Sequence, residues 1–117
     1  MGFDIIWKLV IENWKLNNMQ ILFLGTSSGW PLPRLGCKCH ICASQDQKDK
    51  RLRPSLLLNK SILIDASPDI YHQLGTYSID PREITSIFIT HAHDDHIAGL
   101  YDLSHIYNHR QKIELVA

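Results

Sequence analysis

The sequence predicts an α/β domain, because short apolar runs typical of buried strands alternate with segments that carry helix signals. Each apolar run is four or five residues long and rich in Ile and Leu. No internal repeat, low-complexity stretch or long linker interrupts the alternation. A chain of 117 residues is long enough for one small domain.

Local signals place the individual strands and helices. Two apolar runs flank Asn59-Lys60, which is typical of a hairpin with a two-residue turn. Ser67 and Pro68 indicate the N-cap and the first residue of a helix, and Gly75 indicates its end. The expected strands are residues 20–24, 55–58, 61–65, 86–89 and 112–116, and the expected helices are 68–74 and 99–109, with a short turn at 80–83.

The composition is that of an ordinary globular protein, with 44% hydrophobic and 21% charged residues. Twelve basic and twelve acidic side chains cancel, so the net charge favours neither nucleic acid nor an anionic membrane as a partner. The three cysteines fall within six residues. An odd and tightly spaced set argues against a disulfide framework, and we therefore expect a reducing, cytoplasmic location.

Residues 1–18 form an apolar N-terminal extension of unknown role. Lys8, Glu12 and Lys15 interrupt it, so its longest apolar run is far shorter than the roughly 20 residues that span a membrane. It lacks the cleavage site of a signal peptide. We interpret it as a helix packed on the domain or as an artefact of an early start codon, since Met19 directly precedes the first strand. A helix lying on a membrane surface or on a partner is the alternative.

The stretch from Thr90 to His96 contains three histidines and two aspartates directly after the strand expected at 86–89. Loops at strand ends often present catalytic groups on a rigid scaffold. His91 and His93 are two residues apart and can point the same way, whereas Asp95 and His96 are adjacent and must diverge. The pattern therefore indicates two metal ions side by side, held by imidazole and carboxylate ligands.

The second candidate metal site is Cys37-x-Cys39-x-x-Cys42. Three thiolates at this spacing can hold one structural zinc, and the fourth ligand must then come from elsewhere. His40 is a candidate, although it lies inside the same short loop. The alternative is three free buried thiols.

Two further sites keep open alternatives. Asp65 ends the strand at 61–65 and is either a partner that orients a metal-bound histidine or a turn aspartate. Arg51 and Arg53 belong either to a solvated loop or to a site that contacts a substrate phosphate, because Arg makes bidentate contacts with phosphate.

The pattern His-x-His-x-Asp-His at residues 91–96 resembles the signature of the metallo-β-lactamase superfamily. The segments Gly25–Gly29, Gly36–Cys42, Arg51–Ser55 and Leu63–Ala66 look like one branch of it, which contains the phosphoribosyl cyclic phosphodiesterase of phosphonate breakdown. The resemblance covers residues 19–117, everything except the N-terminal extension.

The resemblance implies the first half of a four-layer αβ/βα sandwich, with residues 19–117 as the N-terminal part of a domain that is incomplete at its C-terminus. His91 and His93 would bind one divalent ion, zinc or manganese, and Asp95 and His96 a second, with Asp95 also catalytic. The three cysteines would hold a structural zinc that a histidine near the C-terminus completes, and the remaining ligands would lie beyond Ala117. Asp65 would orient a metal-bound histidine.

The implied function is a metal-dependent hydrolase, a phosphodiesterase that acts through a metal-bridged hydroxide. The expected partner is a small-molecule phosphodiester, with RNA as another candidate substrate and no membrane. Other reactions on the same fold are alternatives: a ribonuclease Z-like activity, thioester hydrolysis or a role in cofactor biosynthesis. A zinc-binding module without catalysis is the alternative outside enzymes.

Overall fold

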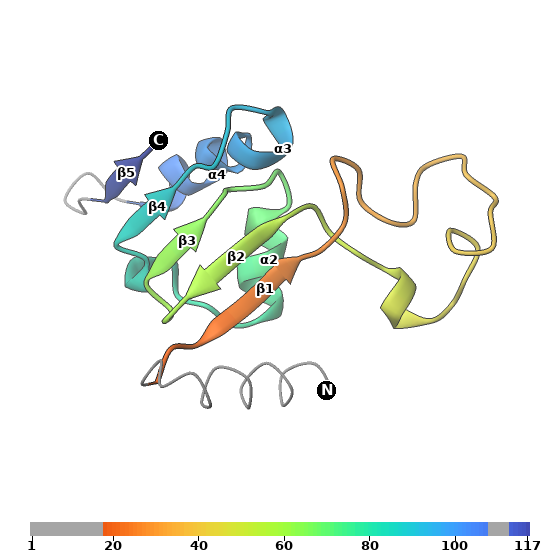
Figure 1. Cartoon of the computed structure of the whole chain (residues 1–117), viewed down its shortest axis with the longest axis horizontal. Coiled ribbons are helices and arrows are strands. Elements are labelled where there is room, and N and C mark those ends of the chain that lie inside the picture. Colours follow the sequence, from red (N-terminus) through yellow and green to blue (C-terminus); the bar gives the residue numbers. More distant parts are fainter. Residues whose placement is uncertain (1–17, 108–112) are drawn as a thin grey trace.

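A computed structural model of the chain describes residues 18–107 and 113–117 (Figure 1). The expected N-terminal extension therefore lies outside the described residues, apart from Asn18. The described strands are β1 (Ile21–Gly25), β2 (Ser55–Leu58), β3 (Ile62–Ile64), β4 (Ser86–Phe88) and β5 (Glu114–Val116). The described helices are α2 (Ile70–Thr76), α3 (Asp94–Ile97) and α4 (Gly99–Ile106), with the 3-10 helices η1 (Gln47–Asp49) and η2 (Pro81–Glu83).

The strands form one mixed sheet in the order β1-β2-β3-β4-β5. The pairs β1-β2 and β2-β3 are antiparallel, and the pairs β3-β4 and β4-β5 are parallel. Because two antiparallel steps restore the direction, β1 runs the same way as β3 and β4. The C-terminal ends of these three strands and the start of β2 consequently lie at one edge of the sheet (Figure 1).

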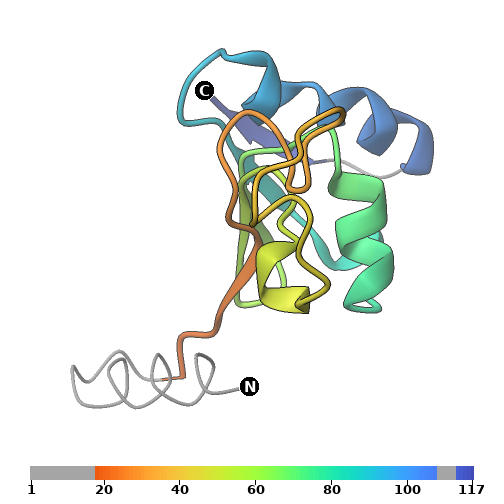
Figure 2. The same cartoon turned by 90° about the vertical axis from the view of Figure 1, so that its right-hand side faces the viewer.

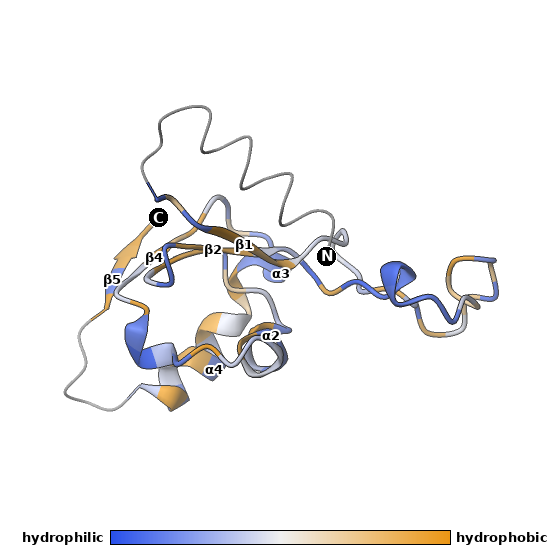
Figure 3. Ribbon diagram, turned by 90° about the horizontal axis from the view of Figure 1, so that it is seen from below, coloured by the Kyte–Doolittle hydropathy of each residue, from blue (hydrophilic) through white to orange (hydrophobic). Residues whose placement is uncertain are grey.

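Helices α2 and α4 pack on the same face of the sheet (Figures 2 and 3). Strand residues alternate between the two faces, so Leu57, Leu63 and Ile87 all point toward these helices. The buried core consists of Leu24, Leu57, Leu63, Ala66, Ile70, Leu74, Ile84, Ile87 and Leu103. Burial of this apolar surface is the main favourable term that holds the helices to the sheet.

The opposite face of the sheet is also apolar. The strand register aligns one residue from each strand in a row across it: Phe23, Leu56, Ile64, Phe88 and Val116. The two phenylalanines remain 41% and 40% exposed. A sheet with apolar residues on both faces is typical of one that is covered on both sides, as in a layered sandwich.

The hairpin expected around Asn59-Lys60 is confirmed, because β2 and β3 pair directly across it. Both turn residues have positive φ, 50° and 63°. Two consecutive residues of this kind characterise the type I′ turn, whose twist matches that of the flanking strands.

The expected helix boundaries were partly wrong. The first helix begins at Ile70 rather than at Pro68, and Gly75 lies inside it rather than ending it. Ser67 still satisfies part of the helix start, because its hydroxyl accepts a hydrogen bond from the Asp69 backbone N–H at 3.2 Å. The second half of the histidine-rich stretch is not a loop but the short helix α3.

The expected helix at 99–109 is confirmed as far as Ile106. Tyr107 has an extended backbone and is not part of it, and residues 108 and 109 lie outside the described ranges. Within the described ranges, no helix has the length and apolar character that crossing a membrane requires.

We predict that Gly99→Ala destabilises the protein by about 1–3 kcal/mol, the typical cost of forcing extra atoms into a packed site. A Cβ at Gly99 would meet the backbone oxygens of Ser67 and Ala66. Gly75→Ala is the matched control, since nothing lies within 4 Å of its Cβ position and alanine favours a helix by up to about 1 kcal/mol. Urea unfolding of both variants measures the difference, and equal stability of the two would contradict this packing.

Candidate functional site

The residues of the predicted metal centre lie at the sheet edge where β1, β3 and β4 end. His91 and His93 follow β4 on an extended segment, and Asp95 and His96 belong to α3. His93 is the residue that precedes the first turn of α3, with extended φ and ψ of −69° and 144°. The change from extended chain to helix at this residue divides the four side chains into two pairs.

Asp65 connects this segment to β3. Its carboxylate accepts hydrogen bonds from the Thr90 backbone N–H at 2.8 Å and from the Thr90 hydroxyl at 2.7 Å. It also lies 2.7 Å from Nδ1 of His96, and its side chain is only 8% exposed. Burial raises the pKa of Asp65, but these hydrogen bonds outweigh it and hold the pKa below its ordinary value. Asp65 is therefore a carboxylate at neutral pH.

The Asp65 carboxylate determines which nitrogen of His96 is free. A carboxylate only accepts hydrogen bonds, so His96 donates from Nδ1. In a neutral imidazole the other nitrogen, Nε2, then carries the lone pair that can bind a metal. This nitrogen lies 3.1 Å from Oδ2 of Asp95.

The same carboxylate acts on His91 through Thr90. The single hydroxyl hydrogen of Thr90 is donated to Asp65, so its oxygen accepts a hydrogen bond from Nδ1 of His91, 3.0 Å away. The lone pair of a neutral His91 is consequently on Nε2, which lies 3.1 Å from Nδ1 of His93. Sequence reasoning missed this role of Thr90, for which its position directly before the motif is the only signal.

The two donor pairs fit two metal ions. Two ligand nitrogens on a tetrahedral zinc lie about 3.3 Å apart, given Zn–N bonds of about 2.0–2.1 Å. The His91–His93 and Asp95–His96 pairs are both separated by 3.1 Å. The rings of His91 and His96 are 4.0 Å apart, so the pairs are adjacent. The structure thus brings these four residues and Asp65 together as expected, while their ligand roles stay a prediction.

A cleft of about 540 Å³ opens beside the histidines. It is lined by Gly29, Trp30, Arg53, Pro68, Ala92, His93, Asp94 and Asp95. The loop after β1 lies against the metal centre, since a Cβ at Gly29 would be 3.6 Å from the Asp95 carboxylate. The cleft therefore combines residues from four segments that meet at the same sheet edge.

Arg53 and Asp69 form an ion pair in the wall of this cleft. Nη2 of Arg53 donates to Oδ1 of Asp69 at 2.8 Å, and Nε donates to Oδ2 at 3.0 Å. These hydrogen bonds raise the pKa of Arg53 and lower that of Asp69. The sequence carries no signal for this pair, because its members are 16 residues apart on different segments.

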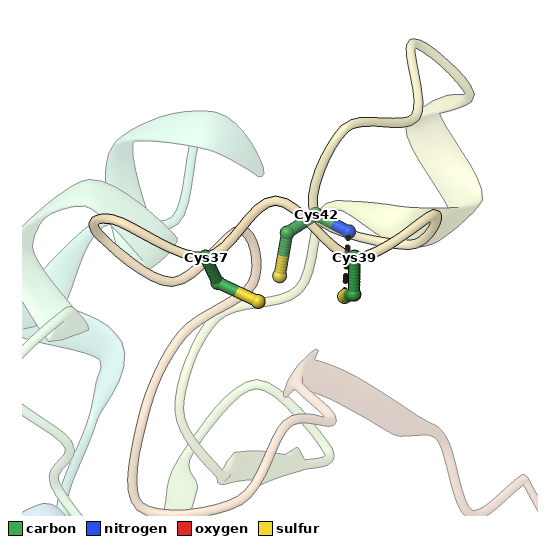
Figure 4. Close-up of side chains that lie close together, drawn as sticks. All are labelled: Cys37, Cys39 and Cys42. Atoms are coloured by element: carbon green, nitrogen blue, oxygen red, sulfur yellow. Dashed lines mark hydrogen bonds between the residues drawn. The ribbon is translucent and has the colours of Figure 1, made fainter.

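The three cysteines lie apart from the histidines, on the long connection between β1 and β2 that projects from the sheet (Figure 1). Their sulfur atoms point toward one another and lie within 4.8 Å (Figure 4). Among the described residues they are the only such group of three or more ligand atoms. His40 is not part of it, so the structure does not support His40 as a local fourth ligand.

The environment of Cys39 favours its thiolate, whereas burial and the neighbouring thiols raise the pKa of Cys42. The backbone N–H of Cys42 donates to Sγ of Cys39 at 3.4 Å, and that of Arg34 donates to Sγ of Cys42 at 3.5 Å. The first of these hydrogen bonds, together with the contacts between the thiols, lowers the pKa of Cys39 to about 7. Thiolates are the form that binds zinc. The thiols are largely exposed, which excludes the alternative of three buried free cysteines.

The chain matches a known protein family over more than half of its length. The family described as "Anti-Pycsar protein Apyc1" matches residues 50–117. This range begins just before Arg53 and includes Asp65 and the histidine-rich stretch.

Several known proteins resemble the chain. A diphosphatase from the PhnP family is 34% identical, with a TM-score of 0.75 over 83% of this chain and 40% of that protein. Zn²⁺-bound PqqB from Methylobacterium extorquens is 27% identical, with a TM-score of 0.66 over 81% of this chain and 38% of PqqB. The metallo-β-lactamase fold protein YhfI from Bacillus subtilis, 18% identical, has a TM-score of 0.55 over 75% of this chain and 30% of YhfI.

Among curated proteins, the octanoyltransferase of Porphyromonas gingivalis is 41% identical over 97 residues, which are 80% of this chain and 19% of that protein. Most of that protein lies outside the match, so its name describes a much longer polypeptide than the matched part. The chain spans between about a fifth and a third of the curated relatives that it matches.

We predict that Asp65→Asn weakens metal binding in the full-length protein by about 10- to 100-fold, the typical cost of removing a residue that orients a ligand. Asparagine tolerates the positive φ of 59° at this position, so the backbone is kept. Competition with a chelator measures the affinity. Asp80→Asn, which removes an exposed carboxylate paired with Arg82, is the control. Unchanged affinity in Asp65→Asn would show that the histidines need no such orientation.

We also predict that Cys39→Ser removes one zinc per chain from the full-length protein and lowers its Tm by about 5 °C or more, because structural zinc contributes directly to folding. His40→Ala should leave both zinc content and Tm unchanged, since His40 is outside the sulfur cluster. Metal analysis and thermal unfolding measure the effects. A Cys39→Ser protein with normal zinc content and normal stability would rule out a structural zinc at these thiols.

Proposed function

Because the chain belongs to the family of the anti-Pycsar protein Apyc1 and has part of the metallo-β-lactamase fold, we propose that the protein is a metal-dependent phosphodiesterase. The observation that carries this proposal is the arrangement of two donor pairs, each separated by 3.1 Å, beside a cleft whose wall carries Arg53. Two cations and an arginine suit a substrate with a negatively charged phosphoryl group.

The chain supplies two ligands to each of two divalent ions. His91, through Nε2, and His93, through Nδ1, would hold the first ion, and Asp95 and His96 the second. When bound, such ions polarise the phosphoryl oxygens and lower the pKa of a coordinated water toward about 7. The Zn²⁺-bound state of PqqB supports divalent ions in this fold.

The neighbouring side chains orient the candidate metal ligands and position the attacking water. Asp65 and Thr90 hold Nδ1 of His96 and of His91 as hydrogen-bond donors, so that Nε2 of each ring would be free to bind an ion. Asp95 lines the cleft as well as facing His96, so one of its oxygens can accept a hydrogen bond from the attacking water. This would give Asp95 a catalytic role in addition to its role as a ligand.

The cysteine cluster would hold a third ion with a structural role. It lies on the projecting connection and not in the cleft, so we assign it no chemistry. Three free and mostly exposed thiols also favour a reducing compartment, and we propose a cytoplasmic location.

We predict that the full-length protein with divalent ions hydrolyses bis(4-nitrophenyl) phosphate with a higher kcat/KM than a chromogenic thioester or β-lactam. His91→Ala should lower that value by more than about 100-fold, because losing a ligand costs more than losing a residue that only orients one. His72→Ala, on the exposed face of α2, should have no effect. Preference for the thioester would assign the protein to another reaction of the fold. Activity that survives His91→Ala would remove the metal centre from the mechanism.

A further inference from the structure

The cleft beside the metal centre has one cationic side chain. Of the described residues that line it, Arg53 is the only lysine or arginine, whereas Asp94 and Asp95 are acidic. The side chain of Arg53 is 24% exposed, so it is partly buried but still reaches the open space. Arg51, two residues earlier, does not line the cleft and interacts with Thr26 and the Lys48 backbone.

Asp69 holds the inner edge of the Arg53 guanidinium. Two N–H groups of the side chain, at Nε and Nη2, donate to the two carboxylate oxygens. The backbone N–H of Arg53 also donates to Oδ2 of Asp69, at 2.9 Å. One carboxylate thus fixes both the backbone and the side chain of Arg53, which limits the side chain to one orientation.

The segment that carries Arg53 is held by buried polar groups. The amide of Gln73, which is completely buried, donates to the Arg53 carbonyl oxygen at 2.8 Å and accepts from the Ser67 hydroxyl at 3.0 Å. Gly25 allows this approach, since a Cβ there would meet the same carbonyl oxygen and the Gln73 amide. A residue with buried supports of this kind is preorganised, so little conformational entropy is lost when it binds a ligand.

The outer edge of the guanidinium remains available. Arginine has five N–H donors, of which Asp69 accepts two from the side chain. No partner for Nη1 is found among the described residues. The donors left on Nη1 and Nη2 form a planar fork, the geometry that matches two oxygens of a phosphate.

We propose that the outer edge of Arg53 binds a phosphate oxygen of the substrate, with Asp69 as the residue that positions it. This inference deepens the proposed function, because it names the group that recognises the anion in the same cleft. Arg53 and Asp95 line the same cleft, so a phosphoryl group bound beside Asp95 would be close to the Arg53 guanidinium. Arg53 is then a specificity residue that favours anionic over neutral esters.

The test compares Arg53→Lys with Arg51→Lys in the full-length protein loaded with divalent ions. Lysine keeps the positive charge beside Asp69 but has no planar fork. We expect the Kd of inorganic phosphate, measured by calorimetry, to rise about 10- to 100-fold in Arg53→Lys, as for a lost charge-assisted hydrogen bond. The Arg51→Lys variant should stay within about twofold, as is usual for an exposed charge.

Kinetics with bis(4-nitrophenyl) phosphate locate the bound anion. This substrate has a single phosphate, so a parallel fall in its kcat/KM places Arg53 on the reacting group. Weaker phosphate binding with unchanged diester kinetics would show that the anion at Arg53 is not the phosphate of the substrate, which contradicts the proposal. Unchanged phosphate affinity in Arg53→Lys overturns it.

A labelling experiment covers the case in which Arg53→Lys does not fold. In the wild-type protein, inorganic phosphate should slow the modification of Arg53 by 4-hydroxyphenylglyoxal, but not that of Arg51, as read by peptide mass spectrometry. Equal protection of both residues, or of neither, would overturn the proposal. If the wild-type protein binds phosphate at Arg53 but does not hydrolyse the diester, the proposed function fails and the anion site stands.

Discussion

The arrangement of the candidate metal ligands depends on the carboxylate of Asp65. It lies directly after β3 and accepts hydrogen bonds from the backbone N–H and the hydroxyl of Thr90, which follows β4, and from His96 in α3. Without it, Thr90 and His96 would each leave a polar group poorly paired in a partly buried place, which costs about 1–3 kcal/mol per group. The hydrogen bonds that join β3 to the segment after β4 also orient the imidazoles of His91 and His96. The Asp65 side chain therefore contributes both to stability and to the geometry of the candidate site.

A buried polar network extends this constraint toward the cleft. The Ser55 hydroxyl donates to the Asp65 carbonyl oxygen at 2.9 Å and accepts from the Ser67 backbone N–H at 3.1 Å. Ser67 in turn donates to Gln73, which supports the segment of Arg53. Every polar group in this buried network is hydrogen-bonded, which is the condition under which buried polar groups specify one structure rather than weaken it. The metal ligands and the arginine are thereby held relative to one another.

The sequence predicted those parts of the protein that local signals determine. The strands, the hairpin and the grouping of His91, His93, Asp95 and His96 could be predicted, because alternation, turn residues and motif spacing act over a few positions. The start of α2 was misplaced, since Ser67 is drawn into the buried network with Gln73 instead of capping a regular first turn. The pair Arg53–Asp69 could not be predicted, because tertiary packing alone brings these distant residues together. For Asp65 the residues alone left two roles open, and its hydrogen bonds with Thr90 and His96 favour the orienting one.

The candidate metal ligands and the loop that helps to line the cleft belong to different segments at this sheet edge. The candidate ligands follow β4, whereas Gly29 and Trp30 follow β1 and line the same cleft. Trp30 is 68% exposed and lies outside the range that the family match covers. Because such a residue contributes little to the core, its replacement is expected to cost little folding stability. The loop after β1 can therefore change in sequence and reshape the cleft while the candidate ligands keep their positions.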